Sequence, residues 1–158
     1  GLVDKFLPAS IENVKENGKI YAMPWDIGPA AVYYRKDMFE KANVDPKAIE
    51  TWDDFIEAGK KVQAANLGVT MTGYSEDNDF FHMLFNQLGG TFVKDNKIAI
   101  NSPEAVKALE LLKKMQDANI LINIKDWNGR IIALNNNKIA TIIFPVWSTA
   151  MSLSASPS

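Results

Sequence analysis

The sequence has 158 residues, of which 47% are hydrophobic and 23% charged, and its net charge at pH 7 is −2. This length suits one compact domain, and the composition excludes a wholly disordered chain. The longest apolar runs, such as residues 139–147, are too short to cross a bilayer. Basic and acidic residues are spread evenly, so no nucleic-acid partner is expected. The absence of cysteine excludes disulfides, thiolate zinc sites and a cysteine nucleophile.

Residues 1–17 mix apolar side chains with turn-forming residues, which predicts a short helix or an irregular lead-in. Ser10 is expected to cap a helical turn that Gly18 closes. This segment leads into the most informative part of the chain.

The stretch 18–42 has the pattern of a strand, a polar break, a second strand and a helix. Two prolines and a glycine in the break leave Trp25 and Asp26 on a rigid, partly extended segment. Residues 30–34 are mostly apolar, which predicts a strand buried on both faces. An indole beside a carboxylate can bind a polyhydroxylated ligand, because the ring covers apolar C–H faces and the carboxylate accepts hydroxyl hydrogen bonds. An alternative with equal support places Trp25 in the core and Asp26 in a turn.

Two helix starts are well marked. Thr51 and Asp54 have the spacing of a capping box, before a helix whose apolar residues recur at helical spacing. Trp52 belongs to this apolar set, so we expect it to pack and not to bind a ligand. Ser102, with Pro103 after it, is expected to cap a second helix.

The middle of the chain combines a short strand pattern at 67–73 with an acidic cluster and an apolar helix. Tyr74 lies where the strand gives way to the helix, and ligands of α/β domains gather at such strand ends. Asp77 and Asp79 are more simply explained by compensation of the helix dipole. His82 lies in the apolar helical stretch, which favours a core or edge histidine over a catalytic one.

The last third of the chain carries two more tryptophans. Residues 123–129 are expected to form a loop that holds Trp127, which either rims a ligand site or closes the loop. A helix and a turn follow, then a buried strand over 139–144, and Trp147 comes directly after it. On pattern alone, Trp147 is equally well a core or an interface aromatic. The small-residue tail 151–158 is expected to be poorly packed.

Three blocks of sequence carry a family resemblance. They are GKIYAMPWDIGP at 18–29, YYRKDMFEKANVDP at 33–46 and TWDDFIEAGKK at 51–61. In this order and spacing they resemble the extracellular solute-binding proteins of carbohydrate ABC transporters, the group similar to maltose-binding protein. The resemblance covers nearly the whole chain and weakens after about residue 147. A glycine is usual in the family where Asn137 stands here, and asparagine is a suitable replacement because it tolerates left-handed geometry.

The resemblance implies an α/β fold, a periplasmic-binding-protein type II-like lobe with a mixed sheet flanked by helices. It implies that residues 1–158 form a single lobe, the partial C-terminal lobe of a two-lobe protein. It also implies that several aromatic and acidic side chains meet the ligand. These ligand-binding candidates are Trp25, Asp26, Tyr74, Trp147 and Trp127.

The function implied is capture of a sugar or oligosaccharide for an ABC permease, with stacking on the tryptophans and hydrogen bonds to the carboxylate. The resemblance implies no enzymatic activity, cofactor or metal. It implies a periplasmic or extracellular, membrane-anchored protein made as a lipoprotein precursor. The chain has no signal peptide, which suggests a piece of a longer precursor whose second lobe is elsewhere.

Two other classes of function remain open from the residues. A carbohydrate-active enzyme fragment needs two carboxyl groups that flank one glycosidic bond, and Asp26, Asp53, Asp54 and Asp77 are candidates. A structural fragment without independent activity would self-associate into a homo-oligomer through exposed apolar surface.

Overall fold

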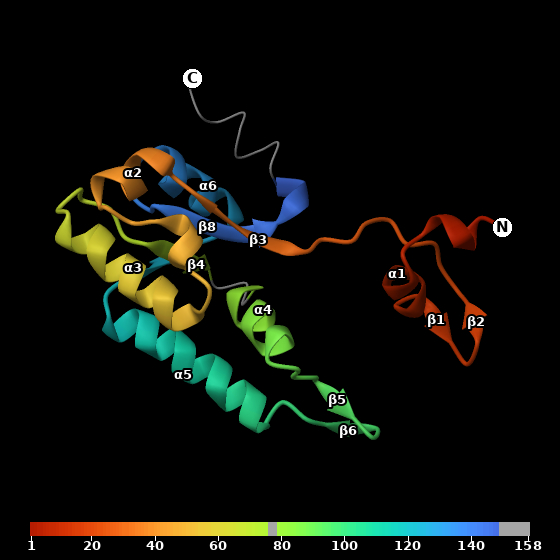
Figure 1. Cartoon of the computed structure of the whole chain (residues 1–158). Coiled ribbons are helices and arrows are strands. Elements are labelled where there is room, and N and C mark those ends of the chain that lie inside the picture. The colour runs from red at the N-terminus through yellow and green to blue at the C-terminus, as the bar shows by residue number, and fades with distance from the viewer. Residues whose placement is uncertain (76–78, 149–158) are drawn as a thin grey trace.

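The structure is a computed structural model that describes residues 1–75 and 79–148 (Figure 1). The helices are α1 (Pro8–Glu12), α2 (Lys36–Lys41), α3 (Trp52–Ala64), α4 (Asp79–Gln87), α5 (Pro103–Asp117) and α6 (Trp127–Asn135), with short 3-10 helices η1 (Val3–Lys5), η2 (Pro46–Ala48) and η3 (Val146–Ser148). The strands are β1 (Lys15–Glu16), β2 (Lys19–Ile20), β3 (Ala30–Tyr34), β4 (Thr72–Ser75), β5 (Val93–Lys94), β6 (Lys97–Ile98), β7 (Leu121–Ile124) and β8 (Thr141–Pro145). No helix in these ranges is long and apolar enough to cross a membrane.

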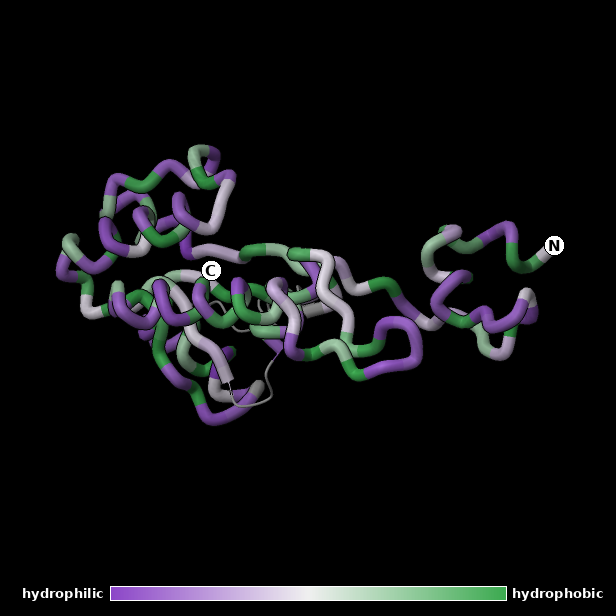
Figure 2. Tube along the Cα trace, turned by 90° about the horizontal axis from the view of Figure 1, so that it is seen from below, coloured by the Kyte–Doolittle hydropathy of each residue, from purple (hydrophilic) through white to green (hydrophobic). Residues whose placement is uncertain are grey.

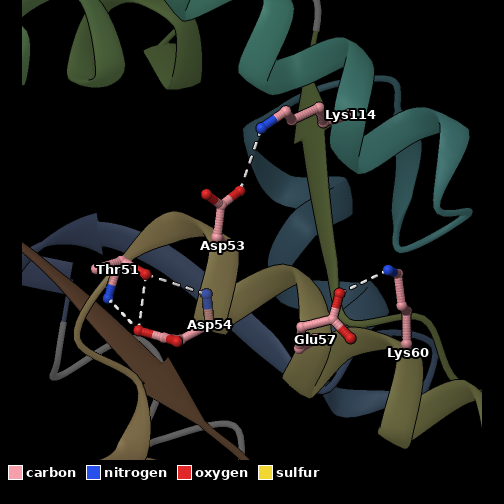
Figure 3. A network of polar contacts seen from close by, with 6 residues as sticks. All are labelled: Thr51, Asp53, Asp54, Glu57, Lys60 and Lys114. Carbon is pink, nitrogen blue, oxygen red and sulfur yellow. Dashed lines mark hydrogen bonds and ion pairs between the residues drawn. The ribbon is translucent and has the colours of Figure 1, made fainter.

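The two marked helix starts form as the sequence predicts. At the start of α3, the Thr51 hydroxyl accepts a hydrogen bond from the Asp54 N–H at 3.1 Å, and the Asp54 carboxylate accepts one from the Thr51 N–H at 2.8 Å (Figure 3). This reciprocal pair is the predicted capping box, and it satisfies two backbone donors that the helix cannot. At α5, the Ser102 hydroxyl accepts from the Ala105 N–H, and Pro103 is the first helical residue.

Four helices end at an asparagine in the left-handed region. Asn43, Asn66, Asn119 and Asn137 follow α2, α3, α5 and α6 with φ between 51° and 57°. The N–H of the residue after Asn137 then donates to the Ala133 carbonyl at 2.8 Å, which closes the end of α6. The expectation that Asn137 can replace a turn glycine is therefore confirmed.

The central sheet is mixed and has the strand order β3-β8-β4-β7. β3 pairs antiparallel with β8, and β4 pairs parallel with β7. A parallel bridge between Thr70 and Ile139, with the Thr141 N–H donating to the Met71 carbonyl at 2.8 Å, joins the two pairs. The mixed sheet with flanking helices is the fold class that the sequence indicates.

The two faces of the sheet are covered by different helices (Figure 1). Because side chains alternate along a strand, Ile143 of β8 packs in the larger core with residues of α2, α3, α4 and α5. Its neighbours Ile142 and Phe144 belong to a smaller cluster on the other face, where Leu134 of α6 packs. As predicted, Trp52 packs as well, edge-on against Phe55 at 5.6 Å.

Residues 1–20 lie apart from this body in both views (Figures 1 and 2). They contain α1 and the β1–β2 hairpin and are joined to β3 by the extended segment 21–29. The prediction that Ser10 caps a helix is wrong. Ser10 lies within α1, which begins at Pro8, and its hydroxyl donates to the Leu7 carbonyl at 2.7 Å.

Two other expectations about local structure are wrong. The strand β3 is not buried on both faces, since 46% of Val32 and 43% of Tyr34 are exposed. Within the described ranges β3 pairs only with β8, so it is an edge strand. The predicted loop 123–129 instead contains the end of β7 and the first turn of α6, because pairing with β4 extends the chain there.

Candidate functional site

The candidate site is an open pocket at the end of β8. The strand ends at Pro145, and the following 3-10 turn places Trp147 at the pocket wall with 52% of its surface exposed. The pocket has a volume of about 470 Å³. Its lining includes Asp79, His82, Asn86, Phe144, Pro145 and Trp147.

The Trp147 ring has support from two sides. The Phe144 ring meets it edge-to-face at 87°, with the centroids 5.7 Å apart, which is a favoured arrangement for aromatic pairs. Gly28 approaches so closely that a Cβ built there would lie 3.1 Å from the Pro145 Cβ and 3.5 Å from the Trp147 Cδ1. The stretch that leads into β3 therefore packs against the tryptophan, and only glycine fits without a shift of Pro145.

A buried arginine lies behind the pocket. Arg130 of α6 is 2% exposed, and its Nη2 lies 3.2 Å from the Asp79 Oδ2 at the start of α4. The guanidinium carbon lies 4.6 Å from the centroid of the Phe144 ring, within the range of a cation–π contact. Asp79, which the sequence suggested as a dipole-compensating residue, thus also carries an ion pair at the pocket.

Tyr74 lies on a neighbouring pocket of about 340 Å³. This second pocket is mostly aromatic and apolar, with Phe80, Phe81 and Leu112 in its lining. His82 lines both pockets, so the pockets of Tyr74 and Trp147 share this side chain. The exposed position of His82 agrees with an edge histidine and not with a core one.

Trp25 and Asp26 do not join this group. Trp25 is 100% exposed, and Asp26 is exposed beside it on the extended segment. Neither lines the two pockets described above. Trp127 begins α6, where the Asp126 carboxylate accepts a hydrogen bond from the Gly129 N–H at 2.9 Å. The Trp127 side chain, Asp77 and the tail 151–158 lie outside the described residues.

The pocket at Trp147 suits an uncharged, hydroxyl-rich ligand. The indole offers an apolar face, while the Asp79 carboxylate, the Asn86 amide and the His82 imidazole supply hydrogen-bonding groups. Among the described residues, no group of three or more His, Asp or Glu side chains is arranged to hold a metal ion. Stacking and hydrogen bonding are the interactions that this geometry provides.

Sequence reasoning missed Arg130 and the support that it gives to the pocket. One signal was available, since Arg130 is the only charged residue in the nine-residue helix α6. A single charge in an apolar helix indicates a buried cation with a specific partner. The partner itself lies 51 residues away in the sequence, and only the fold identifies it.

Comparison with known proteins gives a consistent result along the chain. Residues 1–153 match the family model described as bacterial extracellular solute-binding protein. The chain is 32% identical over 154 residues to the arabinooligosaccharide-binding protein of Bacillus subtilis, covering 91% of this chain and 34% of the relative. It is 30% identical to the lactose-binding protein of Rhizobium radiobacter, again over 91% of this chain and 35% of the relative.

A solved structure shows the same fold. The ABC transporter associated binding protein of B. animalis subsp. lactis Bl-04, in complex with β-1,6-galactobiose, superposes with a TM-score of 0.83 and 28% identity. The match covers 99% of this chain and 40% of that one. The chain thus spans about a third of the length of the curated relatives it matches. With the family model matched over nearly every residue, this chain belongs to the bacterial extracellular solute-binding proteins.

Proposed function

We propose that this chain is part of the ligand-binding lobe of an ABC-transporter sugar receptor, and that it binds a carbohydrate at the Trp147 pocket. The observation that carries the proposal is the exposed Trp147 ring at the end of β8, beside the carboxylate, amide and imidazole groups of the same pocket. The relatives named for arabinooligosaccharide and lactose, and the structure with β-1,6-galactobiose, support a sugar as the ligand class.

In this proposal, the protein works by binding and not by catalysis. A sugar ring stacks on Trp147 while its hydroxyls bond to the polar groups of the pocket, and closure of the rest of the protein over the sugar presents it to a membrane permease. Trp25, Asp26, Tyr74 and Trp127 remain proposed ligand contacts. Trp25 and Asp26 reach the sugar only if the extended segment moves or if the sugar extends beyond the pocket. The family description supports a periplasmic or extracellular location. Membrane anchoring as a lipoprotein is part of the same proposal.

The test is a titration of the ¹⁵N-labelled chain with β-1,6-galactobiose, an arabino-oligosaccharide, lactose and maltose, followed by the indole N–H signals of the four tryptophans. We expect a selective, saturable shift of the Trp147 signal with a Kd of about 1 mM, because part of a site supplies part of the binding energy.

Two variants serve as a matched pair for this titration. Trp147→Ala should abolish the sugar-induced shifts of the backbone amide signals around the pocket, whereas Trp52→Phe, in a packed position on α3, should preserve them. The proposal would be contradicted if no sugar shifts the Trp147 signal at a concentration of about 50-fold the expected Kd. A sub-micromolar affinity of this chain alone for a sugar would also contradict it.

A further inference from the structure

Behind the pocket lies a buried cation that no hydroxyl-binding role explains. Arg130 is 2% exposed, and burial of a guanidinium is costly unless its charge is compensated. A methionine or leucine of similar volume would fill the same space in α6 without that cost. The arginine must therefore provide something that an apolar residue cannot.

Arg130 contacts two walls of the pocket at once. Its Nη2 pairs with Asp79 of α4 at 3.2 Å, and its guanidinium carbon lies 4.6 Å from the ring centroid of Phe144 on β8. Phe144 in turn meets the Trp147 ring edge-to-face at 5.7 Å. One side chain thus connects the carboxylate of the pocket with the ring that supports its tryptophan.

We propose that Arg130 is a positioning residue for ligand binding, which sets the orientation of Trp147 through Phe144 and holds the Asp79 carboxylate at the same pocket. The proposal rests on the proposed function of that pocket. The guanidinium fixes the Phe144 ring from the α6 side, and the Phe144 ring sets the plane of the indole. A sugar ring then meets a stacking face and a hydrogen-bond acceptor whose relative placement is fixed before it binds.

The proposal requires an arginine and not simply a positive charge. A guanidinium is planar, so it can stack on an aromatic ring and donate in its plane to a carboxylate at the same time. A lysine ammonium can pair with Asp79 but has no flat face for Phe144. Arg130→Lys therefore keeps the buried charge and removes the stacking, which makes it the informative variant.

Arg35 supplies a matched control in the same lobe. Its guanidinium pairs with both Asp37 oxygens, at 2.9 and 3.0 Å, and donates to the Asn137 side chain beyond the end of α6. Arg35 lines neither of the two pockets. Arg35→Lys therefore weakens the structural contacts of an arginine that touches neither Phe144 nor Trp147.

The experiment compares Arg130→Lys, Arg35→Lys and Phe144→Leu in the full chain, by the indole N–H signals without sugar and by titration with β-1,6-galactobiose. We expect Arg130→Lys and Phe144→Leu to shift the Trp147 signal before any sugar is added, because the ring current acting on the indole changes. The Trp52 signal, whose Nε1 donates to Gln87 at 2.7 Å, serves as the internal reference and should stay in place. Binding should weaken about three- to tenfold in Arg130→Lys, as expected for loss of one cation–π contact, and remain unchanged in Arg35→Lys.

The outcomes distinguish a positioning role of Arg130 from a role in folding alone, and they test this role separately from the proposed function. If Arg130→Lys leaves the Trp147 signal in place, or shifts it no more than Arg35→Lys does, the positioning role is wrong. If Arg130→Lys does not fold, Phe144→Leu still tests the link, since an unshifted Trp147 signal there would overturn it. If no sugar binds the parent chain, the proposed function fails, while the signals without sugar still decide whether Arg130 orients the tryptophan.

Discussion

At the scale of single residues, Asn119 shows what the left-handed helix ends contribute. It follows α5 with φ 55°, a conformation that costs a residue with a plain Cβ about 1–2 kcal/mol. We expect Asn119→Ala to lower the free energy of unfolding by about that amount, and Asn119→Gly to change it by less than about 0.5 kcal/mol. Urea denaturation measures both, and equal losses in the two variants would refute the backbone explanation.

Asp54 connects the capping box to pH. Hydrogen bonds from the Thr51 hydroxyl, and then from the Thr51 and Glu50 N–H groups, hold the pKa of the Asp54 carboxyl below its usual value of 3.8. The ionised form is thus favoured by folding, so its contribution to stability is present above pH 3.8 and is lost as the pH falls through the lower folded-state pKa.

We therefore expect Asp54→Asn to be less stable than the parent at neutral pH, with a difference that narrows in acid below the usual aspartate range. Urea denaturation across that pH series measures the difference. Glu57→Gln is the control, because Glu57 is an exposed carboxylate of the same helix that pairs with Lys60 outside the cap (Figure 3). If the free energies of unfolding of the parent and of Asp54→Asn differ by the same amount at neutral and acid pH, the link between the Asp54 pKa and stability is ruled out.

The caps could be predicted because they depend on residues three or four positions apart. Thr51 with Asp54, and Ser102 with Pro103, carry their partners in the local sequence. Arg130 could not be placed in this way, because its contacts come from α4 and β8. The exposure of Trp25 is also non-local, since it depends on what the rest of the fold brings near the extended segment.

At the scale of elements, α3 packs through a glycine against Ile120, the residue before β7. A Cβ built at Gly59 would lie 2.8 Å from the Ile120 Cγ2, closer than real contacts allow. Alanine would gain about 1 kcal/mol of helix propensity but lose about 1–3 kcal/mol to overpacking. We expect Gly59→Ala to destabilise the chain as measured by thermal or urea unfolding.

A double-mutant cycle checks that this contact is the cause. Ile120→Ala should cost less in the Gly59→Ala background than in the parent, because the smaller side chain relieves the overlap. Gly18→Ala is a comparison of another kind, since nothing lies within 4 Å of a Cβ placed on Gly18 and only its φ of +76° opposes the change. Additive effects of Gly59→Ala and Ile120→Ala would show that Gly59 and Ile120 do not meet as described.

Strand identity was harder to predict than helix identity for a physical reason. A helix satisfies its backbone within one segment, so α3 and α5 are visible in their own periodicity. A strand depends on its neighbour, and β7 is a strand because β4 pairs with it from Leu121 to Ile124. The apolar run of β3 was correctly predicted as a strand, but its position at the edge of the sheet is set by the topology.

At the scale of the whole molecule, the exposed edge of β3 favours association. Val32 is 46% exposed on this strand, and edge strands with apolar side chains pair readily with another chain. We predict concentration-dependent self-association, measured by analytical ultracentrifugation, and expect Val32→Lys to shift the chain towards monomer. Val106→Lys is the matched control, because Val106 is 48% exposed but lies on α5. Equal effects of the two lysines would mean that β3 is not the contact.

The family and the mixed sheet could be predicted from sequence because three blocks between residues 18 and 61 occur in the order and spacing of the family. The candidate site could not, because its two pockets combine residues of β4, α4, α5 and the end of β8 that lie far apart in the sequence. Trp147 was a candidate through the family resemblance, and the pocket around it depends on how α4 packs beside β8.

The extended segment 21–29 between the hairpin and β3 also determines where a protease cuts the chain first. Tyr21 and Trp25 are 69% and 100% exposed, on backbone outside helices and strands, so their peptide bonds can enter an enzyme cleft without unfolding of the core. Brief chymotrypsin treatment should therefore release the hairpin first and leave a fragment that begins near residue 26. That fragment would keep Gly28 against Trp147, and hence the whole pocket, on a shorter chain.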